Sequence, residues 1–106
     1  MVRGLISNSS NTVFWSAAST WEVAIKYALR RLPLPETPEK FLPLQLEKNR
    51  IESLPITNEH AIQAGQLPRH HRDPFDRMLI AQAQIESLVL LSTDSQFKRY
   101  DVEVRW

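Results

Sequence analysis

The sequence contains no cysteine, and only two of its 106 residues are glycine. The absence of cysteine excludes a disulfide framework and thiol chemistry. With only Gly4 and Gly65, a glycine-rich phosphate-binding loop cannot form. Long apolar runs are also missing, and the N-terminus lacks the charged-then-apolar layout of a signal peptide. We therefore expect a cytoplasmic protein without a membrane span.

The sequence has no large excess of charge of either sign. Thirteen lysine and arginine residues face twelve aspartate and glutamate residues, which gives a net charge of +1. Any affinity for nucleic acid must therefore come from local clusters of basic residues. A length of 106 residues is typical of one domain with one core, so we expect a single domain over residues 1–106.

Strand-like and helix-like patterns alternate along the chain. Trp21 and Ile25 recur at helical spacing, which predicts that Trp21 lies in the core. Alternation of this kind favours an α/β fold with a small parallel sheet flanked by helices. The expected strands cover residues 13–15, 50–56, 88–91 and 102–104, and the expected helices cover residues 17–31, 37–49, 57–64, 73–86 and 94–100.

The start of the helix over residues 73–86 is the most informative feature. Asp73 is a typical N-cap, Pro74 suits the first helical position, and Asp76 falls at the third. Asp76 therefore begins the apolar stripe of the helix, where a charge requires a partner. Asp76 can alternatively serve only the helix dipole, without a catalytic role. The apolar positions that follow are Leu79, Ile80 and Ala83.

Three segments carry a resemblance to a known family. Residues 67–83 read LPRHHRDPFDRMLIAQA and closely resemble the HRDPFDRLLIAQA-type segment of PIN-domain ribonucleases, specifically the VapC-like toxins of bacterial toxin–antitoxin pairs. Residues 16–26 resemble the SAASxWEIAIK segment of the family, and residues 88–97 resemble its strand and TxDxxF turn. The resemblance implies that Glu22, Asp76 and Asp94 are catalytic acids that bind a metal ion.

Two of these acids also have a simpler interpretation. Ser19 and Glu22 have the spacing of a capping box, and Asp94 can cap a short helix. For either residue alone, capping is the better interpretation. All three acids in this order and spacing favour the family resemblance.

The residue types also suggest the chemistry of such a site. Crowded carboxylates repel one another, and a hard divalent cation such as Mg²⁺ or Mn²⁺ keeps them ionised in one place. Basic residues near the acids suit contacts with RNA phosphates, although solvated surface charge is the alternative. We expect RNA contacts from Lys26, His71, Arg72 and Arg77.

The resemblance further implies hydrolysis of RNA such as tRNA, neutralisation by a VapB-like antitoxin, and a homodimer. One feature departs from the family pattern: such proteins begin with an apolar strand that ends in the first active-site Asp, but here no Asp precedes Asp73. Residues 1–11 resemble the end of the next helix and its loop. We therefore expect an N-terminally truncated PIN-like domain that lacks the first strand. The alternative function is a catalytically impaired protein that acts only by binding an antitoxin or a second copy.

Overall fold

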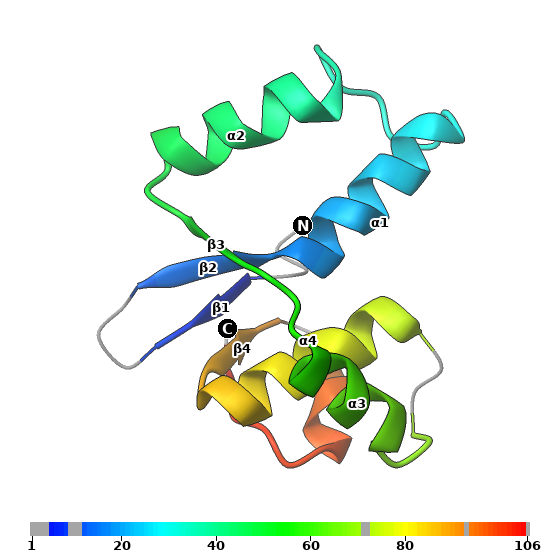
Figure 1. Ribbon diagram of the computed structural model, residues 1–106, viewed down its shortest axis with the longest axis vertical. Helices are drawn as coiled ribbons and strands as arrows, with labels where there is room; N and C mark the ends of the chain where they lie inside the picture. Colours follow the sequence, from blue (N-terminus) through cyan, green and yellow to red (C-terminus); the bar gives the residue numbers. More distant parts are fainter. Residues whose placement is uncertain (1–4, 9–11, 71–72, 93, 106) are drawn as a thin grey trace.

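The computed structural model describes residues 5–8, 12–70, 73–92 and 94–105. Strands alternate with helices along these residues, as the sequence predicts (Figure 1). The elements are β1 (Leu5–Ser7), β2 (Val13–Ser16), α1 (Ala17–Ala28), α2 (Pro38–Lys48), β3 (Glu52–Leu54), α3 (Asn58–Gln66), α4 (Pro74–Glu86), β4 (Val89–Leu91), the 3₁₀ helix η1 (Ser95–Arg99) and β5 (Val104–Arg105).

The sheet has the strand order β3-β2-β1-β4-β5. Strand β2 runs parallel to β3, and β4 runs parallel to β5, whereas β1 runs antiparallel to both of its neighbours. Four of the five strands therefore point the same way, which confirms the predicted α/β class. Helices α1 and α2 lie to one side of the strands, and α3 and α4 lie to the other (Figure 1).

Strand β1 corrects the expectation for the N-terminal segment. We expected residues 1–11 to resemble the end of a helix, but Leu5–Ser7 form the central strand. Ile6 is completely buried, so the segment supplies an apolar side chain to the core. Only five residues separate Ser7 from Val13, which is too short for a parallel crossover. The connection therefore dictates the antiparallel direction of β1.

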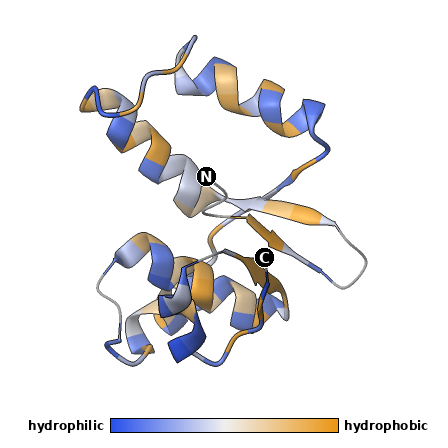
Figure 2. Ribbon diagram, turned by 180° about the vertical axis from the view of Figure 1, so that it is seen from behind, coloured by the Kyte–Doolittle hydropathy of each residue, from blue (hydrophilic) through white to orange (hydrophobic). Residues whose placement is uncertain are grey.

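The hydrophobic core lies between α4, the strands β1 and β4, and η1. Helix α4 contributes Leu79, Ile80 and Ala83, the three apolar positions that the sequence predicted. In contrast, α2 has no buried residue, and α1 buries only Ala18 and Ser19. Apolar residues colour both halves of the molecule in Figure 2, although only one half holds the main core. The remaining core members are Ile6, Leu67, Leu90, Phe97 and Tyr100.

A buried polar chain joins α4 to β2 and α3. The Ser16 hydroxyl donates to Gln82 Oε1 at 2.6 Å, and both residues are fully buried. Gln82 Nε2 donates to the Pro55 carbonyl oxygen at 3.3 Å. His60 Nδ1 accepts from the Thr57 N–H, so Nε2 carries the proton that it shares with Glu86 at 2.7 Å. Each side chain in this chain of contacts has a partner, which offsets the cost of burial.

Two helix ends differ from the prediction. Helix α1 was expected to continue to residue 31, but it stops at Ala28 because Arg30 adopts a positive φ of 56°. Gly65 lies inside α3 and does not stop it. The helix ends one residue later because Leu67 precedes Pro68, which disfavours helical backbone.

Among the described residues, no helix is long and apolar enough to cross a bilayer.

Replacement of Ser16 by Ala should destabilise the fold more than loss of an ordinary helix cap. Ser16 Oγ both caps α1, accepting from the Ala18 N–H at 3.0 Å, and satisfies Gln82. We expect Ser16→Ala to lower the free energy of unfolding by about 2 to 4 kcal/mol. Thr57→Ala, which removes only a cap, is the matched control and should cost about 1 kcal/mol. Urea unfolding measures both, and equal losses would contradict a structural role for the Ser16–Gln82 bond.

Candidate active site

The N-terminus of α4 is built as the sequence predicts. Asp73 is the N-cap, and its Oδ1 accepts from the N–H of Phe75 at 2.9 Å and of Asp76 at 3.2 Å. Pro74 occupies the first helical position. Asp76 has an exposed fraction of only 3 %, so its carboxylate lies at the buried edge of the apolar stripe. The positive end of the helix dipole favours a negative charge at this place.

The carboxyl ends of β2 and β4 lie at the same edge of the sheet. Trp15 and Leu91 both pair with Leu5 of β1, so β2 and β4 end level with each other. With one strand between them, these ends lie about 10 Å apart. Helix α1 starts from the first end and Asp94 follows the second. Helix α4 also begins at this edge. A short turn joins its C-terminal end to the start of β4, so the helix runs opposite to the strand and its N-terminus lies near the carboxyl end of β4.

An aromatic contact brings α1 against the start of α4. The rings of Trp21 and Phe75 meet edge to face, with 5.3 Å between their centroids and an angle of 74°. Glu22 and Asp76 each directly follow one of these residues. The helical turns that carry the two acids therefore lie beside each other.

Trp21 was predicted to be a core residue, and this prediction was wrong. The residue is 62 % exposed, and Ile25 of α1 and Leu29 at the C-cap of the helix are 37 % and 58 % exposed. Helix α1 turns its small residues, Ala18 and Ser19, toward the interior. Helical spacing identifies an apolar face but does not say whether anything covers it.

Glu22 lies within α1 and has no part in capping the helix. The N-cap is Ser16, so the alternative in which Ser19 and Glu22 form a capping box is wrong. Lys26 Nζ lies 3.1 Å from Glu22 Oε2, and the Glu22 side chain is 15 % exposed. A cation that binds Glu22 would have to compete with this ammonium group.

Asp94 is exposed at the start of η1. Its Oδ1 accepts from the Gln96 N–H at 2.9 Å, which confirms the predicted capping role. The bond uses one of its two carboxylate oxygens. In residues 5–8, 12–70, 73–92 and 94–105, no three His, Cys, Asp or Glu side chains gather closely enough to hold a metal ion. The three acids have suitable oxygen donors, and their assembly into one site stays a prediction.

The chain matches the family model of the PIN domain over residues 2–103. The chain belongs to the PIN-domain family. It is also 36% identical over 59 residues to Ribonuclease VapC16 from Mycobacterium tuberculosis, an alignment that covers 56% of this chain and 40% of that protein. The matched region thus spans about two fifths of the length of this relative. No solved structure matches the chain significantly.

Two of the four residues predicted to contact RNA, Lys26 and Arg77, lie in the described part of this PIN domain. Lys26 is paired with Glu22. Both terminal nitrogens of Arg77 donate to backbone carbonyl oxygens at the end of α3. His71 and Arg72 lie outside the described residues. Their contacts with RNA remain a prediction.

Sequence reasoning missed the polar residues that support the site. Gln82 lies between the apolar positions Ile80 and Ala83, and an amide on a buried stripe signals an internal hydrogen bond. Tyr100 gave no such local signal. Its hydroxyl donates to the Pro68 carbonyl oxygen at 3.1 Å, a contact between residues 32 positions apart.

The Trp21–Phe75 contact should make a measurable contribution to holding α1 against α4. A double-mutant cycle of Trp21→Ala and Phe75→Ala should give a coupling free energy of about 0.5 to 1.5 kcal/mol, as is typical of edge-to-face aromatic pairs. The same cycle with Trp21→Ala and Ile62→Ala is the control, because Ile62 lies on α3 and is 61 % exposed. Chemical unfolding provides the free energies. A coupling as small as in the control would argue against this contact.

Proposed function

We propose that this chain is a VapC-like, metal-dependent endoribonuclease that hydrolyses RNA phosphodiester bonds. The main support is the pairing of two helical turns, one with the buried Asp76 and one with Glu22, within a PIN domain. Similarity to a protein named as a ribonuclease supports the same activity.

The acids Glu22, Asp76 and Asp94 would hold Mg²⁺ or Mn²⁺. PIN-domain proteins of the VapC type generally use divalent metal ions, and carboxylate oxygens are the ligands that these ions prefer. When bound, the ion would polarise a phosphate oxygen and activate a water for in-line attack on phosphorus. Asp94 would contribute the oxygen that does not cap η1, and Glu22 would turn from Lys26.

Basic residues next to the acids would position the RNA backbone. Lys26, His71 and Arg72 flank the proposed site along the sequence, and phosphate contacts of this kind orient RNA without reading its bases. Arg77 would support RNA binding indirectly, by holding the backbone carbonyl groups at the end of α3 to which it donates. The substrate would be a structured RNA such as tRNA, and a VapB-like antitoxin would neutralise the enzyme in the cytoplasm.

RNA cleavage tests the proposed activity. The purified chain should cut labelled tRNA or total RNA with Mg²⁺ or Mn²⁺ and should be inactive in EDTA. Asp76→Asn and Glu22→Gln should each reduce the rate by about a hundredfold or more, because each removes a proposed ligand. Asp101→Asn is the matched control, since Asp101 is an exposed acid outside the proposed site.

Manganese binding gives a second measurement that does not depend on RNA. Electron paramagnetic resonance should detect bound Mn²⁺ in the wild-type chain and weaker binding in Asp76→Asn. Metal-independent cleavage, or no cleavage with either ion, would rule out the proposed activity for this chain.

A second candidate function is protein binding without catalysis, through the surface of α1 and α2. Trp21 and Ile25 of α1 and Leu29 at its C-cap form an exposed apolar stripe. A cleft of about 570 Å³ lies between the two helices, lined by residues that include Ala24, Leu42 and Leu46. The absence of three clustered acids in the described part of the chain also favours this candidate.

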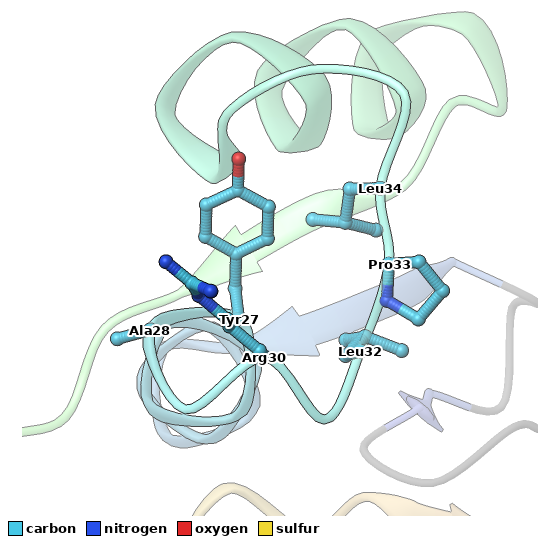
Figure 3. A pocket seen from close by; sticks show the side chains of 6 residues that line it. All are labelled: Tyr27, Ala28, Arg30, Leu32, Pro33 and Leu34. Carbon is cyan, nitrogen blue, oxygen red and sulfur yellow. The ribbon is translucent and has the colours of Figure 1, made fainter.

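A hollow of about 440 Å³ lies where α1 joins the segment that leads to α2 (Figure 3). Tyr27 rises from α1 toward α2, with Arg30 beside its ring and Leu34 on the opposite side. Tyr27 lines both this hollow and the cleft between the helices. The two hollows therefore form neighbouring parts of one incompletely packed surface.

The total accessible surface is larger than that expected for a compact monomer of this mass. It measures 7143 Å², whereas a compact monomer of 12.3 kDa exposes about 6,100 Å². The excess of about 1,000 Å² is comparable to the ~800 Å² that one partner contributes to a standard interface. We propose a second copy of this chain as the partner.

Sedimentation equilibrium tests this second candidate. The wild-type chain should be a dimer, and Ile25→Lys with Leu29→Lys should shift it to a monomer because charges cannot be buried unpaired. Ile62→Lys, a change of an apolar residue on α3 that is 61 % exposed, should leave the dimer intact. A wild-type monomer at all concentrations would exclude self-association.

A further inference from the structure

Two side chains converge on the segment that joins α3 to α4. Arg77 Nη1 donates to the Pro68 carbonyl oxygen at 3.0 Å, and the Tyr100 hydroxyl donates to the same oxygen at 3.1 Å. Arg77 comes from the first turns of α4, and Tyr100 follows η1. One carbonyl group is thus held from two directions by elements far apart in the sequence.

Arg77 also donates hydrogen bonds to the C-terminal end of α3. Its Nη2 donates to the carbonyl oxygens of Ala64 at 2.8 Å and of Leu67 at 2.9 Å. The last carbonyls of a helix have no partner within the helix and carry partial negative charge. Helix α3 has no basic residue in its own last turn. A guanidinium from the next helix therefore supplies the missing donors.

Tyr100 holds the segment by its ring as well as by its hydroxyl. Tyr100 is 6 % exposed, and its ring meets that of His70 edge to face with 5.3 Å between centroids. Because Tyr100 is anchored in the core, its contacts fix both Pro68 and His70. Arg69 lies between these two residues and is exposed.

We propose that Arg77 and Tyr100 are positioning residues that hold Arg69 and His70, the described part of the basic segment before α4, in place for RNA binding. This inference rests on the proposed ribonuclease function. Arg77 directly follows Asp76, and Tyr100 lies at the end of the 3₁₀ helix that Asp94 caps. The same two elements therefore contact residues 68–70 and carry two proposed catalytic acids.

Arg77 and Tyr100 together form a clamp on residues 68–70. Loss of this clamp should weaken RNA binding without removing a phosphate contact. A loosened segment must be ordered when RNA binds, and that entropy opposes association. Tyr100→Phe removes one hydrogen-bond donor and no charge. Arg77→Lys keeps the charge but loses the planar fork that reaches several carbonyls at once.

The first measurement is limited proteolysis with trypsin, which needs no nuclease activity. Cleavage after Arg69 should be about fivefold faster in Tyr100→Phe and in Arg77→Lys, since each loses hydrogen bonds to the segment. Cleavage after Lys48 serves as the internal reference and should not change. Tyr27→Phe and Arg105→Lys are matched control variants, and unchanged cleavage after Arg69 in both clamp variants would overturn the proposal.

The second measurement is the Kd for labelled tRNA by fluorescence anisotropy in EDTA, where the proposed nuclease cannot act. Tyr100→Phe should raise the Kd about fivefold while the dependence of Kd on salt keeps its slope, because no charge is lost. An unchanged Kd would refute the positioning role, and a changed salt slope would contradict its mechanism. Failure of the wild-type chain to cut RNA with metal would instead refute the proposed ribonuclease activity, so the two failures are distinguishable.

Discussion

The hydrogen bond between Ser16 and Gln82 is the interaction on which the arrangement of the site depends. It joins the point where β2 becomes α1 to the middle of α4, and both partners are fully buried. A buried amide left without its partner carries a desolvation penalty, so alternative placements of α1 against α4 are disfavoured. Because Glu22 lies on α1 and Asp76 on α4, the relative position of these acids follows from this contact and from the Trp21–Phe75 contact at the helix starts.

The two halves of the molecule differ in how completely they are packed. Around α4, apolar side chains from the helix, the central strands and η1 fill one continuous core. Around α1 and α2, apolar residues face a cleft or solvent, and α2 buries none of its side chains. The well-packed half carries Asp76 and the clamp on the basic segment. Helix α1 connects the two halves, because it carries both the proposed acid Glu22 and the exposed apolar residues Trp21 and Ile25.

Features set by neighbouring residues could be predicted from the sequence, and features set by distant contacts could not. Asp73, Pro74 and Thr57 start their helices as predicted, because caps and first-turn prolines act locally. The central antiparallel strand β1 was missed, since its position depends on pairing with both β2 and β4. Exposure of Trp21 was also missed, because a helical repeat does not identify what covers the face. The candidate acids were identified through a resemblance over three segments, and their assembly at one sheet edge stays a prediction.

Arg77 illustrates why residue type alone does not assign a role to a basic side chain near an acidic site. A guanidinium suits phosphate oxygens and the carbonyl oxygens at a helix end equally well, because both present negative charge to planar donors. Its place at the start of α4 brings it to the end of α3, where three carbonyl oxygens accept its hydrogen bonds. In a chain with a net charge of only +1, an arginine used to shape a loop is one fewer available for attraction of RNA. In the proposed function, affinity for RNA would therefore depend on the placement of the other basic residues, and the backbone that carries them would be part of the binding site.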